Sequence, residues 1–159
     1  MSLQPFFQWC EASMVGVAVR ESAWAFAVIE SMHLLALSVI GGAVLVVDLR
    51  LLGLGLRHQP VRDLARDVQP WLNRSLVVMI VTGVLLFLSE SMKCYYSTPF
   101  WVKMASLVLA TTFTFTVRRK VVTADEGRVG PLACTIVALL SLTFWFGVAA
   151  GGRWIGFSG

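Results

Sequence analysis

The amino-acid sequence predicts an all-α fold in which four helices cross a lipid bilayer as a bundle. Of its 159 residues, 57% are hydrophobic and only 14% are charged, and the mean hydropathy is +0.77. A helix that crosses a hydrocarbon core about 30 Å thick needs roughly 20 apolar residues. Four runs come close to this length, at residues 22–47, 75–92, 99–117 and 131–150. Lipid offers no partners to the backbone and the runs lack the alternation of barrel strands, so we predict helices in a single membrane domain over 1–159.

The segment before the first run is predicted to form a short helix in the outer membrane interface. It has no basic start and polar residues interrupt it, which is not typical of a secretory signal. Apolar and small residues recur at helical spacing along it, and two of them are aromatic: Phe6, Trp9, Ser13 and Val17.

A second short amphipathic helix is predicted between the first two runs, on the cytoplasmic surface. Its apolar residues recur among Arg and Asp between Pro60 and Pro70: Val61, Leu64, Ala65, Val68 and Leu72.

The basic residues predict the orientation, because Lys and Arg concentrate in cytoplasmic loops. Those assigned to the cytoplasmic side are Arg50, Arg57, Arg62, Arg66, Arg74, Arg118, Arg119, Lys120 and Arg128. The opposite side keeps only Arg20, Lys93 and Arg153, with Lys103 just inside the third run. Both termini are therefore predicted to face outward. Nucleic-acid binding is not expected, since it needs a basic face with base-reading elements in water.

Ionisable side chains inside a span cost roughly 2.5 to 3.5 kcal/mol each on insertion scales, so they mark candidate functional positions. Glu30 and His33 lie in the first run, Glu90 ends the second, and Lys103 lies one turn inside the third. Counting 1.5 Å per residue, His33 is roughly 16 Å below the outer start of its span, and it is the deepest of the four.

The polar and small residues of each run fall on one helix face, which we expect to point into the bundle. Six glycines are expected mainly to let the helices approach closely: Gly41, Gly42, Gly83, Gly147, Gly151 and Gly152.

His33 has two interpretations on this evidence. A neutral imidazole buried in a membrane bundle is a common ligand of haem iron or of a soft metal. The alternative is a hydrogen bond to Glu30, three residues away, or to a hydroxyl on a neighbouring helix. His58, in the inner loop, is expected to be solvated.

A haem would also need propionate partners and an aromatic slot. The candidates are Lys103, Arg153 and Trp24 near the outer end, Trp145 in the fourth run, and Met79 as a weak sixth ligand. Tryptophan and basic residues near span ends are also ordinary interface anchors, which is the competing explanation.

Other chemistries have weaker support. The sequence contains no phosphate-binding glycine loop and no hydrolase motif. A copper site from His33, a methionine and Cys134 satisfies ligand softness. Cys10 and Cys94 both fall on the outer side, and either a disulfide or two free thiols is consistent with that.

Several motifs along the whole chain resemble a family of small bacterial four-helix integral membrane proteins of unknown function. These motifs are Arg20-Glu21-Ser22 with Trp24, His33 to Leu37, Gly41-Gly42, Asp48 to Gly53, Pro70-Trp71, Thr82-Gly83, Leu85 to Phe87, Phe100 with Lys103, Ser141-Leu142 with Trp145, and Gly152-Arg153. The resemblance implies the bacterial inner membrane and conveys no activity.

A more distant likeness concerns the four-helix membrane protoporphyrinogen oxidases, which hold haem b, and the copper-resistance D membrane family. A histidine in the first span and a lysine at the start of the third mark those oxidases. The likeness implies that His33 is the axial haem ligand and Lys103 a functional lysine. The further histidines of the oxidases are absent here, so only the ligand role carries over.

The leading hypothesis from sequence is therefore a haem b-binding membrane protein for electron transfer or redox chemistry. In it His33 is the iron ligand, Glu30 orients the imidazole or relays a proton, and Lys103 and Arg153 engage propionates. The alternative is a non-catalytic membrane subunit or solute-handling protein in which Glu30, His33, Glu90 and Lys103 form a buried polar network. A redox partner or homo-oligomerisation fits either hypothesis.

Overall fold

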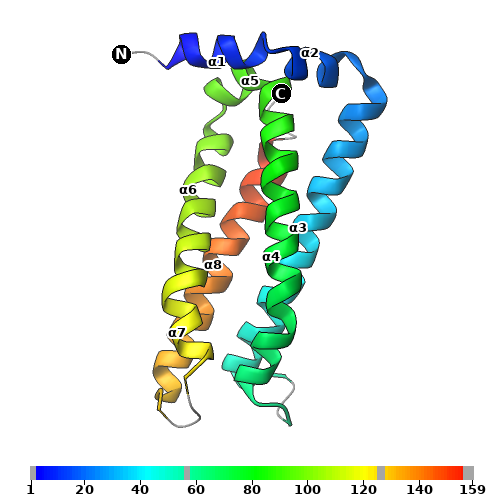
Figure 1. The fold of residues 1–159 in the computed structure, drawn as a ribbon. Helices are drawn as coiled ribbons and strands as arrows, with labels where there is room; N and C mark the ends of the chain where they lie inside the picture. The colour runs from blue at the N-terminus through cyan, green and yellow to red at the C-terminus, as the bar shows by residue number, and fades with distance from the viewer. Residues whose placement is uncertain (1–2, 56–57, 125–127, 156–159) are drawn as a thin grey trace.

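Four long apolar helices dominate the structure, a computed structural model that describes residues 3–55, 58–124 and 128–155. They are α3 (Ala23–Leu51), α4 (Val61–Ser89), a third span built from α6 (Thr98–Phe113), η1 (Thr114–Arg118) and α7 (Arg119–Val122), and α8 (Pro131–Ile155) (Figure 1). All four are long and apolar enough to cross a membrane. Their outward faces carry exposed apolar side chains such as Leu35, Val108 and Leu139. The all-α prediction with four helices capable of spanning a membrane is confirmed, and their apolar surfaces indicate a multi-pass protein in a lipid bilayer.

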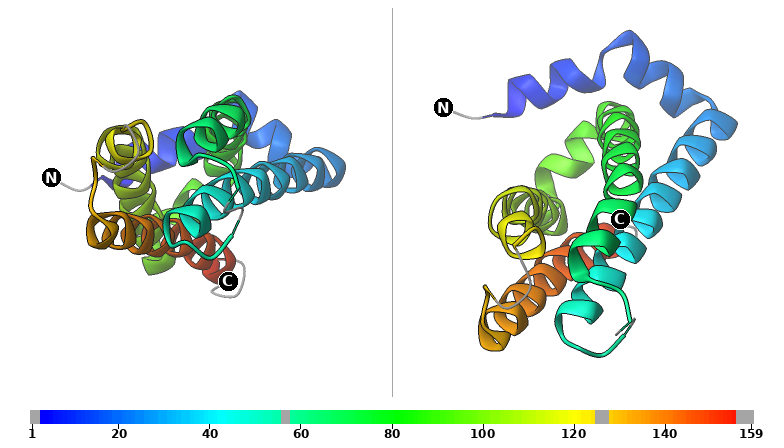
Figure 2. Two further views of the ribbon diagram at one scale, coloured as in Figure 1. Left: turned by 90° about the horizontal axis from the view of Figure 1, so that it is seen from below. Right: turned by 60° about the horizontal axis from the view of Figure 1, so that its bottom comes forward.

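The spans run alternately along one axis, and both chain ends lie at the same end of the bundle (Figure 1). Helix α3 packs against α4, and α6 packs against α8. The two antiparallel pairs join mainly where α3 meets α8, as the end-on view shows (Figure 2). The bundle is therefore two helical hairpins held together by its first and last spans.

Two short helices, α1 (Gln4–Glu11) and α2 (Met14–Glu21), lie across the end of the bundle where the termini are (Figure 1). Phe7 anchors α1, with its ring centroid 5.3 Å from that of Phe87 and 5.0 Å from that of Tyr95. Glu11 accepts a hydrogen bond of 2.7 Å from the backbone N–H of Met92. Tyr95 and Met92 belong to α5 (Ser91–Tyr96), which comes directly after α4. Side-chain contacts thus fix the N-terminal segment to the connection between the second and third spans.

The segment between the first two spans differs from its prediction, because α4 is one continuous helix from Val61 to Ser89. No separate helix ends at Pro70. A proline inside a helix removes one hydrogen bond and costs about 3 kcal/mol or more. Here packing outweighs that cost, since Leu64 and Ala65 form a buried cluster with Val47 of α3 and Val122 of α7. Arg57, one of the predicted cytoplasmic basic residues, lies outside the described ranges.

Glycines allow the close approach of α6 and α8. A Cβ on Gly147 would lie 2.7 Å from Ser106 Oγ, and one on Gly151 would lie 3.0 Å from Lys103 Cβ. The two glycines are four residues apart on one helix face, the spacing of small residues at membrane helix contacts. The packing role predicted for Gly41 and Gly42 is wrong, because a Cβ at either position would meet nothing within 4 Å.

Candidate functional site

Three helices bring His33, Thr82 and Lys103 together near the end of the bundle that carries the termini. His33 of α3 is 7% exposed. Its Nδ1 lies 3.0 Å from Thr82 Oγ1 of α4, and its Nε2 lies 3.3 Å from Lys103 Nζ of α6. Both ring nitrogens of the deepest predicted ionisable residue are thus engaged by side chains from neighbouring spans. We call these three residues the outer polar centre, where outer denotes the end of the bundle that carries α1 and α2.

The hydrogen-bond geometry assigns the tautomer of His33. The Thr82 hydroxyl donates to the carbonyl oxygen of Val78 at 2.7 Å, so its oxygen is left to accept. Nδ1 must then carry the hydrogen that Thr82 accepts, and Nε2 keeps its lone pair. Lys103 has only donors, and one of them points at that lone pair. The result is a directed row from Lys103 through His33 and Thr82 to Val78.

Two glycines lie beside the centre. A Cβ on Gly83 would lie 3.2 Å from His33 Cε1, and one on Gly152 would lie 3.5 Å from Lys103 Nζ. The first distance is tight, so glycine at position 83 leaves room for the imidazole, whereas the second is an ordinary van der Waals contact. Within the described ranges no carboxylate forms an ion pair with Lys103. Lys103 is partly exposed, so it connects the buried imidazole with the surface of the bundle.

The other predicted site residues are not gathered at His33. Glu30 is exposed and has no hydrogen bond or ion pair to His33. Glu90 faces Lys93, 3.9 Å away. Trp24 is 84% exposed on the outside of α3, and Arg153 is exposed at the end of α8.

Met79 and Trp145 are buried in the apolar core below the centre. The indole N–H of Trp145 donates to Thr114 Oγ1 at 3.1 Å. Both side chains fill space between the spans, so the described arrangement has a packed core where an aromatic slot was expected.

A second buried polar group, which sequence reasoning missed, lies toward the opposite end of the bundle. Arg118 Nε donates to Asp48 Oδ1 at 2.7 Å, and the two side chains are 4% and 0% exposed. Arg118 was counted among the basic residues of the cytoplasmic side, and its side chain is buried in the core. The π-helical turn η1 carries it there, since such a turn adds a residue and rotates the helix beyond it. A signal for it in the sequence is that Asp48, directly after the first apolar run, falls at helical spacing from His33 and Gly41.

Metal-binding capacity is limited in the part of the chain that the structure describes. No group of three or more His, Cys, Asp or Glu side chains there is suited to hold a metal ion. Cys134 lies in the first turn of α8, 17 residues before Gly151, which is about 25 Å of helix rise. Since Gly151 packs on Lys103 beside His33, Cys134 is not brought to His33.

The three cysteines are free thiols in the structure. Cys94 lies in α5, outside the spans, and burial raises the pKa of its thiol from 9.0 to about 11, with the Glu90 carboxylate adding to the effect. This thiol therefore stays protonated at neutral pH.

Comparison with known proteins identifies one family whose model matches this chain. The model of a family described as a family of unknown function, DUF6644, matches residues 6–158. No curated protein and no solved structure matches the chain. The likenesses to protoporphyrinogen oxidases and to the copper-resistance D family gain no support from these comparisons.

Proposed function

The chain belongs to the DUF6644 family of unknown function, and from its geometry we propose that it is a solute-handling membrane protein whose outer polar centre takes up and passes on a proton. One observation carries the proposal: the hydrogen-bonded row Lys103, His33, Thr82 inside a membrane bundle, with no carboxylate ion pair on Lys103 in the described ranges. Ionisable groups inside spans are expensive and commonly mark proton or ion pathways.

The row supports a proton transfer that needs no other reactant. A proton leaves Lys103 Nζ and binds His33 Nε2, which turns the ammonium into an amine and the imidazole into an imidazolium. Nδ1 keeps its hydrogen bond to Thr82 throughout, so the ring needs no rotation to accept the proton. The transfer conserves total charge. His33 Nε2 then gives its proton to the solute that the protein handles, and Lys103 is protonated again from the side on which it is partly exposed.

The proposal includes an orientation and a location. The positive-inside rule supports placing the outer polar centre and both termini outside the bacterial inner membrane. Helices α1 and α2 would then lie at the outer interface. Exposed Phe6, Trp9 and Met14 on these helices support this, since such side chains favour the headgroup region.

Proton movement in sealed vesicles tests the proposal. The purified chain is reconstituted around a pH-sensitive dye, the membrane potential is clamped, and an acid step is applied with and without chloride, acetate or phosphate outside. We expect the wild type to acidify the vesicles faster than protein-free vesicles do, and Lys103→Met or His33→Gln to remove the difference. Lys93→Met is the matched control, because Lys93 is an outer lysine that faces Glu90 and not His33. Equal rates for wild type and Lys103→Met under every condition would refute the proposal.

Haem b on His33 is the second candidate, favoured by the tautomer. A ligating histidine commonly donates its other ring N–H to an acceptor, as Nδ1 does to Thr82. Nε2 would be the ligand atom, and a bound haem would supply one-electron redox chemistry. Lys103 Nζ stands 3.3 Å from Nε2, in the place an iron would need, so the described positions of the side chains do not fit haem unless Lys103 turns away.

A visible spectrum separates the two candidates. The chain is purified in detergent after expression with haem available, as wild type and as His33→Ala. A Soret band that disappears in the variant would support the haem proposal. A colourless wild type, or a band that survives the substitution, would exclude His33 as the ligand. Stoichiometric copper in the wild type would instead support a copper-binding protein.

A further inference from the structure

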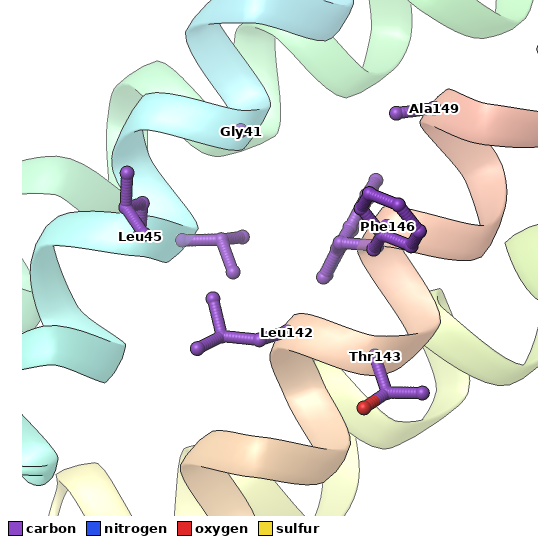
Figure 3. A pocket seen from close by; sticks show the side chains of 8 residues that line it. Gly41, Leu45, Leu142, Thr143, Phe146 and Ala149 are labelled. Carbon is purple, nitrogen blue, oxygen red and sulfur yellow. The ribbon is translucent and has the colours of Figure 1, made fainter.

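An open groove lies between α3 and α8, deeper in the bundle than the outer polar centre. It has a volume of about 540 Å³, within the range of small-molecule sites. Gly41, Val44 and Leu45 line it from α3, and α8 supplies Leu142, Thr143, Trp145, Phe146 and Ala149 (Figure 3). Phe146 is 73% exposed and Leu45 45%, so the groove opens toward the surrounding lipid.

The side chains of the lining offer no free hydrogen-bond donor. The Thr143 hydroxyl donates to the carbonyl oxygen of Leu139 at 2.8 Å, within its own helix. The indole N–H of Trp145 donates to Thr114, away from the groove, which leaves its ring as part of the wall. A space of this kind does not hold water, because water needs two to four polar partners. The lining therefore favours an apolar occupant.

The wall on α3 is open because of glycine. A Cβ on Gly41 would meet nothing within 4 Å, so no packing contact explains this residue. A glycine inside a helix costs roughly 0.8 to 1 kcal/mol relative to alanine. At Gly41 the missing side chain leaves room between two helices that touch elsewhere.

We propose that this groove binds one acyl chain of a bilayer phospholipid. The spans that form it lie in the hydrocarbon of the bilayer, where acyl chains are the solvent and enter from the side. The groove follows α8 from Leu142 to Ala149, about 10 Å of helix rise, which suits a chain lying along the helix and not a compact ligand. Trp145, at 5% exposure, is reached by lipid through this groove.

Quenching of Trp145 by brominated lipid tests the proposal. A variant keeps Trp145 and replaces the other tryptophans, five of the six, by Phe. It is reconstituted in phosphatidylcholine with or without bromine at mid-chain. Bromine quenches indole fluorescence only at close range, so we expect strong quenching of Trp145. The difference between wild type and Trp145→Phe gives the same quantity if the single-tryptophan variant does not fold.

Two neighbouring glycines provide the matched comparison. Gly41→Leu fills the groove and should abolish the quenching of Trp145. Gly42→Leu makes the same change one residue away, outside the groove lining, and should leave the quenching intact. Absence of quenching in the protein that retains Gly41 would overturn the proposal. Equal loss of Trp145 quenching in Gly41→Leu and Gly42→Leu would also overturn it. A dimer in which Trp145 is shielded from brominated lipid would overturn it too, because a second copy would then cover the groove.

Discussion

Thr82 decides which nitrogen of His33 carries the hydrogen. Its hydroxyl is committed to the backbone of its own helix, so it can only accept from the imidazole. The sequence predicted His33 and Lys103 as special, because ionisable residues are rare in spans. It did not single out Thr82 as the partner of His33, since threonines that bond their own helix are common in this chain.

Thr82→Val should remove the acceptor of Nδ1–H and leave a buried donor unsatisfied, which costs about 1 to 3 kcal/mol. We expect a lower melting temperature in detergent and a change in the ¹⁵N histidine spectrum away from the Nδ1–H tautomer. The chain has two histidines, so a His58→Gln background leaves His33 as the single signal.

Two further variants make that result specific. Thr82→Ser keeps the hydroxyl and should keep both the stability and the tautomer. Thr111→Val removes a hydroxyl that bonds only its own helix, at Leu107 and Val108, and should leave the His33 spectrum unchanged. An Nε2–H tautomer in the wild type would contradict the arrangement.

Cys94 should react slowly with alkylating reagents. Its pKa of about 11 leaves roughly 100-fold less thiolate below pH 9 than a thiol with a pKa of 9.0. In a Cys10→Ser, Cys134→Ser background, the iodoacetamide rate should rise about tenfold per pH unit up to pH 11. Because the folded chain holds this proton to higher pH than the unfolded chain, stability should fall between pH 9 and 11.

The Glu90 carboxylate gives the control for Cys94. It raises the thiol pKa, so Glu90→Gln should speed alkylation at pH 8, whereas the unfolded chain should react alike with either residue. A rate for folded Cys94 that matches the unfolded chain at pH 8 would contradict the raised pKa.

At the scale of elements, the sequence predicted the number of spans and their approximate positions, because run length in lipid is a strong constraint. The residues at which the helices begin and end were less predictable. Proline at position 70 suggested a break, but buried contacts of Leu64 and Ala65 with other spans extend α4 through it. The π-helical turn before Arg118 also has no simple pattern in the sequence, so the buried Asp48–Arg118 pair was missed.

The contact between α6 and α8 should be sensitive to Gly151. Gly151→Leu places a side chain where even a Cβ would lie 3.2 Å from the Lys103 backbone, so the helices must separate. Overpacking of this kind costs about 1 to 3 kcal/mol or more. We expect a reduced melting temperature, and Gly42→Leu, whose Cβ meets nothing within 4 Å, should match the wild type. A Gly151→Leu protein as stable as wild type would mean that α6 and α8 do not approach this closely.

On the scale of the whole molecule, the Asp48–Arg118 ion pair ties the hairpin of α3 and α4 to the hairpin of α6 and α8. Asp48 Oδ2 and Ser141 Oγ are both buried without a partner in hydrogen-bonding geometry, although the Ser141 hydroxyl faces the carboxylate. The pair therefore sits among groups from three spans, and the stability of the hairpin interface depends on it.

Removing one partner of the Asp48–Arg118 pair should lower the stability of the bundle more than removing both. Asp48→Leu leaves the Arg118 charge buried and should destabilise the bundle by about 3 to 5 kcal/mol. Asp48→Leu combined with Arg118→Met removes both charges and should recover most of that loss. Thermal unfolding of the single and double variants measures the difference, with Arg119→Met as the exposed control. A double variant less stable than Asp48→Leu alone would contradict this account.

The N-terminal segment has a consequence for the order of assembly during synthesis. Phe7 packs on Phe87 and Tyr95, and Glu11 bonds Met92, 81 residues later in the chain. This segment leaves the ribosome before the residues that it packs against, so it lacks these partners until the second span and α5 have been made. A nascent chain that stops before residue 87 carries an aromatic segment with nothing to dock against, so α1 locks into place only after the first hairpin is complete.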